Sequence, residues 1–192
     1  MSHPPCGFRA VACNPLLGLG ILAVVAAACG GTTAAEGPTT SSTTVPVGAA
    51  ACPTQWAPSS TTPLNPPPTR PGLASTLVPP GPTLLTVCRY AGLNQAVTTG
   101  TMVQSHVVTG SQLPAFVTYI DQPTWPVIPT GAVYGCPASQ GRVDLLQFVY
   151  PSGPGVDVSV DIDGCSFVSN GSLTVSGGAI GTRLTAWVGI DG

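Results

Sequence analysis

The chain of 192 residues carries 5 Lys+Arg and 7 Asp+Glu, so only 6% of its residues are charged, whereas 43% are hydrophobic. It contains no lysine, which excludes a Walker A phosphate loop and Schiff-base chemistry, since both need a lysine amine. The net charge of −2 argues against a nucleic-acid partner, because binding to a phosphate backbone depends on cationic side chains.

The N-terminal residues have the pattern of an export signal. Arg9 supplies a positive charge, and residues 15–28 form an apolar run that is too short for a membrane span, which needs about 20 residues. Three alanines precede Cys29, and two glycines follow it. This arrangement resembles the bacterial lipobox, in which the cysteine is acylated, with palmitate among its chains, and becomes the first residue after cleavage. The resemblance implies a signal peptide at 1–28 and lipid attachment at Cys29. The alternatives are secretion after simple cleavage and an uncleaved anchor.

Two proline-containing segments separate this signal from the folded part. Residues 29–51 are rich in Ser, Thr and Pro and have no apolar periodicity, which predicts a flexible tether. In residues 52–82 prolines recur every few positions and forbid a helix. We expect this segment to be an extended arm that packs along the domain surface, with Trp56, Leu73 and Leu77 as anchors.

Residues 83–192 predict a globular α+β domain. Apolar and β-branched runs favour strands at 83–90, 101–109, 143–150, 156–165 and 172–176, and an apolar period of helical spacing predicts a helix at 111–122. Residues 182–188 suit either a short helix that begins at Thr182 or a strand. The expected fold is a small antiparallel sheet, covered on one face by one or two short helices and stabilised by two disulfides.

The strands at 143–150 and 156–165 are joined by a turn sequence, which predicts a hairpin. A turn centred near Gly153 would pair Phe148 with Val158, Leu146 with Val160 and Gln147 with Ser159. One face of this hairpin would then be apolar and the other polar and solvated, as in a sheet that is covered on one side.

Four of the seven cysteines remain for the domain once Cys29 and the two cysteines of the signal are set aside: Cys52, Cys88, Cys136 and Cys165. An even number in an exported chain indicates two disulfides, with three connectivities available. The hairpin register places Cys165 near the loop that follows Cys136. We therefore expect Cys136–Cys165 and Cys52–Cys88. No Cys-x-x-Cys spacing supports zinc or redox chemistry.

A catalytic or metal site finds little support in the sequence. His106 follows Ser105, but no Gly-x-Ser-x-Gly turn is present, and neighbouring residues of a strand point to opposite faces. The run that contains Asp157, Asp161 and Asp163 suggests calcium, yet it does not fit the EF-hand pattern. We therefore predict no catalytic residue, no metal and no cofactor. Arg89 is expected to form a structural ion pair with one of the aspartates.

The run LLTVCRY at 84–90 and the run GCSFVSNG at 164–171 resemble segments of uncharacterised secreted or lipid-anchored proteins of high-GC actinobacteria. The resemblance covers residues 52–192. It implies a shared disulfide domain and a location in the cell envelope, and it implies no activity.

These observations together predict a cell-envelope lipoprotein with an extracytoplasmic domain in a non-enzymatic binding or structural role. Its partners would be the membrane, through the lipid anchor, and a protein or small ligand outside the membrane. The alternative is a secreted hydrolase that uses His106 with a serine.

Overall fold

The computed structural model describes residues 48–56 and 69–189, which form part of one compact unit spanning Thr43–Gly192. The expected signal peptide, Cys29, most of the expected tether and the centre of the proline-rich arm lie outside these residues.

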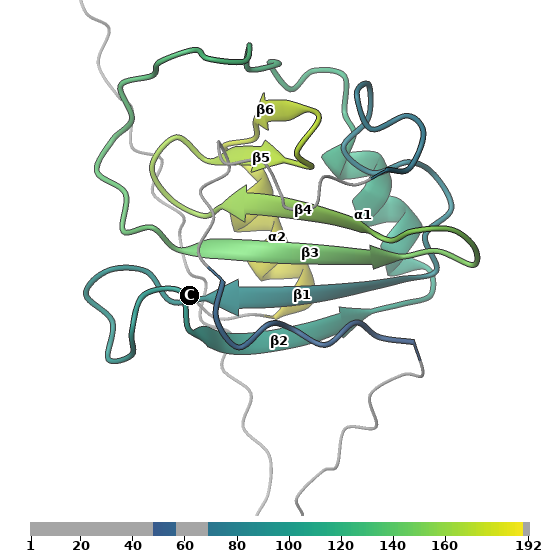
Figure 1. The fold of residues 1–192 in the computed structure, drawn as a ribbon, viewed down its shortest axis with the longest axis horizontal. Coiled ribbons are helices and arrows are strands. Elements are labelled where there is room, and N and C mark those ends of the chain that lie inside the picture. The colour runs from purple at the N-terminus through teal and green to yellow at the C-terminus, as the bar shows by residue number, and fades with distance from the viewer. Residues whose placement is uncertain (1–47, 57–68, 190–192) are drawn as a thin grey trace, which may run out of the picture. The chain divides into compact units, whose positions relative to one another are not determined.

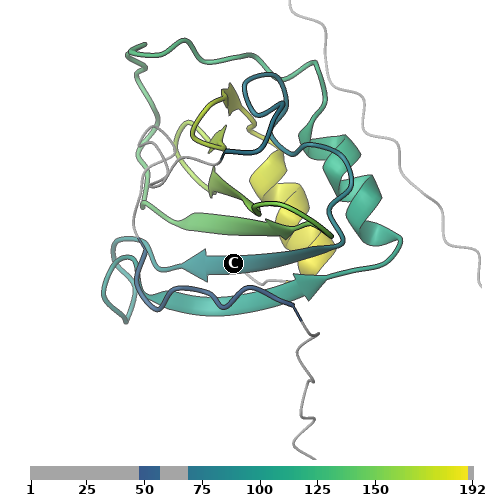
Figure 2. The ribbon, with the colours of Figure 1, turned by 45° about the vertical axis from the view of Figure 1, so that its right-hand side comes forward.

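A six-stranded antiparallel sheet forms the frame of the domain (Figure 1). The strand order is β2-β1-β3-β4-β5-β6. The strands are β1 Leu84–Tyr90, β2 Met102–Val108, β3 Val143–Val149, β4 Val156–Asp161, β5 Phe167–Ser169 and β6 Thr174–Ser176. Two helices, α1 Gln112–Ile120 and α2 Ile180–Val188, lie on the same face of this sheet (Figure 2). The predicted α+β fold, with a sheet covered on one face by short helices, is confirmed.

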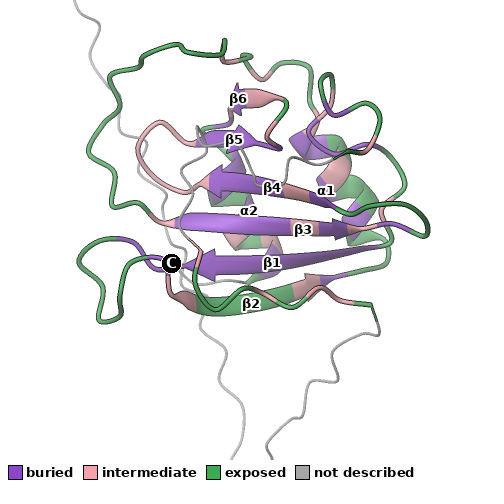
Figure 3. Cartoon of the chain, in the orientation of Figure 1, coloured by how far each residue is buried: buried purple, intermediate pink, exposed green. Residues whose placement is uncertain are grey.

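The core lies between the sheet and the two helices. Strand alternation directs a row of aliphatic and aromatic side chains toward the helices, including Leu85 and Val87 of β1 and Phe148 of β3. The helices contribute buried residues such as Phe116 and Leu184. Figure 3 shows that the central strands are buried along their length, whereas β2 is largely exposed.

The predicted hairpin register is wrong by two residues. Phe148 pairs with Val156, Leu146 with Val158 and Gln147 with Asp157. The turn is therefore centred near Ser152, because β4 begins directly after Gly155. At Gly155 a Cβ would lie only 2.9 Å from the carbonyl oxygen of Phe148, so glycine permits this close approach. A register shift of two residues keeps each side chain on the same face of the strand, which is why the apolar face was assigned correctly.

The expected strand at 156–165 ends earlier than predicted, and the strand β5 that follows it was not predicted. β4 ends at Asp161, and a turn that contains Gly164, with a φ of 71°, leads into β5. The carboxylate of Asp163 accepts hydrogen bonds from the backbone N–H groups of Gln140 and Gly141. Asp163 thus joins the turn to the loop before β3. The Asp163 side chain is therefore a hydrogen-bond acceptor for this loop, and Asp163 is not part of a strand.

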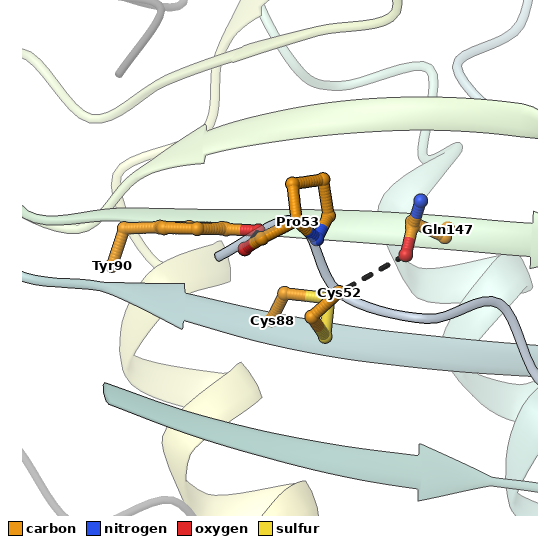
Figure 4. The surroundings of a disulfide bond; sticks show 5 residues. All are labelled: Cys52, Pro53, Cys88, Tyr90 and Gln147. Carbon is orange, nitrogen blue, oxygen red and sulfur yellow. Dashed lines mark hydrogen bonds between the residues drawn. A yellow bond between two sulfur atoms is a disulfide. The ribbon is translucent and has the colours of Figure 1, made fainter. Parts of the chain in front are cut away.

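The second face of the sheet is not the solvated surface that the alternation predicts. Residues 52–56 lie across part of this face, where Tyr90 donates a hydrogen bond to the carbonyl of Pro53 at 2.9 Å (Figure 4). Trp56 packs on the same ring, with centroids 5.4 Å apart. Burial raises the pKa of Tyr90 to about 12. The N-terminal segment of the domain thus provides an apolar cover.

The described C-terminal part of the proline-rich arm, residues 69–82, enters the main core instead of following the surface. Leu73, Leu77 and Val78 are buried in the same cluster as the helix residues. The carboxylate of Asp121, directly after α1, accepts hydrogen bonds from the N–H groups of Leu77 and Val78. The arm is therefore part of the fold.

Asn170, which follows β5, binds this arm to the sheet. Its side chain is fully buried, and its amide nitrogen donates to the carbonyls of Leu73, Thr76 and Leu77 at 2.9–3.2 Å. Its amide oxygen accepts from two N–H groups of the β5–β6 turn. A single amide side chain thus satisfies backbone groups from two distant segments.

Residues 182–188, for which helix and strand were both considered, are helical. The helix begins at Ile180, two residues before the expected Thr182, and ends at Gly189, whose φ is 62°. A left-handed glycine of this kind is a common helix terminator.

Replacement of Asn170 by alanine should destabilise the domain strongly. Each buried backbone group that loses its partner costs about 1–3 kcal/mol, and several lose it together. Urea unfolding followed by tryptophan fluorescence would measure the loss. Ser172→Ala is the matched control, because the Ser172 side chain is exposed and its hydrogen bond to Asn170 is donated by the backbone N–H. Equal stability of the two variants would contradict the role of Asn170.

Candidate functional site

The two helices contact each other through aromatic side chains. Phe116 of α1 lies edge-on to Trp187 of α2, with ring centroids 5.5 Å apart, and Tyr119 lies 6.0 Å from the same indole. Beneath them Phe116 stacks on Phe148 of β3 at 6.4 Å. This aromatic contact fixes the spacing of α1 and α2 above the sheet.

An apolar cleft of about 260 Å³ opens between the helices beside this aromatic contact. Alanines occupy one position on each helix, Ala115 and Ala186, where larger side chains would close the gap. The complete lining is Val108, Gln112, Ala115, Phe116, Ala186, Trp187 and Val188. The amide of Gln112 and the indole N–H of Trp187 are the polar side-chain groups of this lining, and no lining residue is ionisable. The cleft therefore suits an uncharged apolar group better than an ion or a reacting carbonyl.

A buried ion pair fixes the position of α2 over the sheet. Arg89 of β1 makes a bidentate contact with Asp144 of β3, at 2.9 and 3.0 Å, and both side chains are nearly inaccessible. The same guanidinium donates to the hydroxyl of Thr185, at 3.3 Å, one residue before Ala186. Burial raises the pKa of Asp144, and the contact with Arg89 opposes this effect. The expected ion pair of Arg89 is thus present, and it supports one wall of the cleft.

His106 lies outside the cleft, on the exposed strand β2. It pairs with Val87 and so shares the helix-side face of the sheet, whereas Ser105 pairs with Cys88 and points to the other face. Within residues 48–56 and 69–189, His106 makes no hydrogen bond or ion pair with a serine or an aspartate. The described structure therefore does not bring together the residues that the hydrolase alternative requires.

The three aspartates of the suggested calcium run do not converge. Asp157 hydrogen-bonds with Gln147 in β3, and burial raises its pKa. Asp163 contacts Arg142 at 3.2 Å and also Ser139. Although burial raises the pKa of Asp163, its hydrogen bonds from Ser139 and Arg142 keep that pKa below its ordinary value. No three His, Cys, Asp or Glu side chains of the described part of the chain are grouped as a metal site.

Both predicted disulfides are present. Cys52 is bonded to Cys88 and Cys136 to Cys165, with Cα atoms 5.7 and 4.9 Å apart. The first, shown in Figure 4, joins the N-terminal segment to β1 in the middle of the second face. Gln147 Oε1 lies 3.5 Å from the sulfur of Cys88, a contact rather than a hydrogen bond because a disulfide sulfur carries no proton.

The cleft was not predicted from the sequence. The periodicity identified the buried side of α1, but a cleft depends on how two helices are spaced, and only their packed arrangement gives that spacing. The signal that was available is the pair of alanines, each next to a large aromatic residue in Ala115-Phe116 and Ala186-Trp187.

Comparison of the chain with protein-family models, with curated proteins and with solved structures finds no match. Among the helices of the described residues, none has the length and apolar character needed to cross a bilayer.

Loss of Arg89 should be far more costly than loss of another arginine. Arg89→Met would leave Asp144 buried without its main partner, and breaking a buried pair in this way costs about 3–5 kcal/mol. The double variant Arg89→Met, Asp144→Leu should recover most of the loss, because it removes both charges. Arg183→Met is the control, since that guanidinium lies over the ring of Tyr119 and pairs with no carboxylate in the described residues.

Free energies of unfolding from urea titration would measure all three variants. If the single and the double Arg89 variants lost equal stability, the cost would come from lost packing and not from the unpaired carboxylate.

Proposed function

We propose that this chain is a lipid-anchored protein of the cell envelope, whose domain binds a small uncharged apolar molecule outside the membrane. The observation that carries the binding role is the apolar cleft between α1 and α2. Its walls are held in place by the aromatic contact between the two helices and by the contact of Arg89 with Thr185 of α2. Its lining offers carbon surface and one amide, which supports binding rather than proton transfer.

The location rests on two separate arguments. Two disulfides in the domain indicate an oxidising, extracytoplasmic environment. The lipid anchor is supported by the sequence, in which Cys29 follows an apolar run and three alanines. One acyl chain binds a bilayer only marginally, so stable retention requires the two chains of a diacylglyceryl cysteine at Cys29.

The size and chemistry of the cleft restrict the ligand. A volume of about 260 Å³ is small for a drug-sized molecule and suits a single aromatic ring system or a short aliphatic chain. A charged group would lose its hydration there without gaining a partner. We therefore expect the ligand to place an uncharged apolar part in the cleft, with a hydrogen-bonding group near Gln112.

Replacement of Cys29 by alanine should abolish lipid attachment. In cells grown with an alkyne analogue of palmitate, the wild-type chain should become labelled, and the Cys29→Ala chain should carry no label. Cys13→Ala is the matched control, because Cys13 lies in the expected signal, and it should be labelled like the wild type. A Cys29→Ala chain that remains in the membrane fraction like the wild type would refute the anchor.

Filling the cleft should abolish binding. In the full-length Cys29→Ala background, which carries no acyl chain at position 29, N-phenyl-1-naphthylamine should gain fluorescence as its naphthyl group enters the cleft. Ala186→Leu and Ala115→Leu place side chains in its volume and should each weaken binding at least about tenfold, or about 1.4 kcal/mol. Ala138→Leu, in the exposed loop before β3, adds the same side chain elsewhere and should bind as the parent does. If all four proteins bound the probe equally, the cleft would not be the site.

A further inference from the structure

The two edge strands of the sheet, β6 and β2, differ in how far other segments of the chain cover them. At β6, residues 126–128 supply a further pairing segment: Ile128 donates to the carbonyl of Thr174 at 2.8 Å, and Ser176 donates to that of Pro126 at 2.9 Å. This segment covers the outer side of β6. At β2, residues 54–56 pair only with its beginning, where Met102 donates to the carbonyl of Thr54 at 3.1 Å. Beyond Met102, the described residues provide β2 with no main-chain partner except β1.

The unpaired stretch, Val103 to Val107, lacks the usual protection of a sheet edge. Natural edge strands are commonly blocked by lysine, proline or inward-pointing charges. The sequence VQSHV contains none of these, and Val103 is 45% exposed. A bulge opposite Tyr90 is the one protective feature, and it lies at the beginning of the strand. Figure 3 shows this strand as an exposed band at the edge of a buried sheet.

We propose that β2 pairs with β2 of a second copy of this chain, antiparallel and with Ser105 at the two-fold axis. This register places Val103 opposite Val107 of the other copy, and Gln104 opposite His106. The valines lie on one face and form two apolar cross-strand pairs. The amide and imidazole groups lie on the other face, at a spacing that allows hydrogen bonds between them.

Charge supports a second copy as the partner. In an isologous contact the five residues of one copy meet the same five residues of the other, so several charges of one sign in this stretch would repel each other across the axis. The stretch has no acidic or basic residue other than the imidazole of His106, which lies opposite an uncharged amide. A strand with this pattern is complementary to itself.

The position of the N-terminal segment is also consistent with this dimer. A two-fold axis normal to the sheet continues each face into the same face of the other copy. Cys52 of both copies then lies on the face opposite the helices, because it is bonded to Cys88 there. The described chain therefore enters both domains, at Cys52, on one side of the sheet. This step rests on the proposed lipid anchoring, since attachment to one membrane requires that geometry.

A cysteine at position 105 tests the pairing directly. Residues opposite each other across antiparallel strands have Cβ atoms about 4.5–5.5 Å apart, which a disulfide can bridge with a small adjustment. The full-length Ser105→Cys chain, in its own membranes under mild oxidation, should give mostly a band of twice the monomer mass. Peptide mapping of this band should link position 105 to position 105, and not to Cys52 or Cys88, whose disulfide lies opposite it on β1. The control Ser152→Cys, in the exposed β3–β4 turn, should remain mostly monomeric. Equal cross-linking of the two variants would overturn the proposal, as would a Ser105→Cys adduct of any mass other than the dimer.

A second experiment uses association in solution and separates this proposal from the anchor. In the full-length Cys29→Ala background, sedimentation equilibrium should show a mass that rises toward the dimer with concentration. Amide hydrogen exchange in residues 103–107 should slow over the same range. Ser105→Lys places two like charges on the axis and should leave the protein monomeric, whereas Thr118→Lys, on the exposed side of α1, should not.

A protein that stayed monomeric at every concentration, with unchanged exchange in β2, would refute the pairing even if Cys29 were acylated. Dimerisation of the Cys29→Ala chain would support it even if palmitate labelling failed.

Discussion

The buried pair of Arg89 and Asp144 joins three elements that are distant in the sequence. It connects the two central strands β1 and β3, and through Thr185 it reaches α2. A charge in this position must have a partner, since the surrounding side chains are apolar. The pair therefore restricts where α2 can lie, and with it the spacing of the two helices. The cleft follows from that spacing, because its two alanines create open volume only when the helices stand at this distance.

The few charged side chains in the described part of the chain make specific structural contacts, although only Arg89 and Asp144 are buried. Each of the four arginines of the described residues has a specific contact. Arg70 lies 3.6 Å from the ring centre of Tyr150 and donates to two carbonyls of the β3–β4 turn. Arg142 pairs with Asp163, and Arg183 lies over Tyr119. The cations thus act as fixed links between loops and core.

Much of the sheet could be derived from the sequence, because alternation and turn residues are local signals. The apolar face of the β3–β4 hairpin was assigned correctly, and both disulfides followed from the cysteine count and the hairpin. The exact pairing was missed by two residues, since Gly155 permits a tighter turn than a centre at Gly153 assumes. The strand β5 was missed, and the preceding strand was extended to Cys165, because the polar alternation of that run was followed through Asp163-Gly164, which is a turn dipeptide. The arm at 69–82 was placed on the surface, as its prolines suggested, because the partners of its backbone, Asn170 and Asp121, are remote in the chain.

The disulfide between Cys52 and Cys88 determines how a mechanical load enters the domain. Any tension applied to the chain before Cys52 passes through this covalent bond into β1, which lies inside the sheet between β2 and β3. The short pairing of residues 54–56 with the start of β2, and the buried arm that follows, then carry none of this force. The domain can be pulled from its N-terminal side without being peeled from its edge. Reduction of that one bond would transfer the same tension to a few hydrogen bonds at the margin of the sheet.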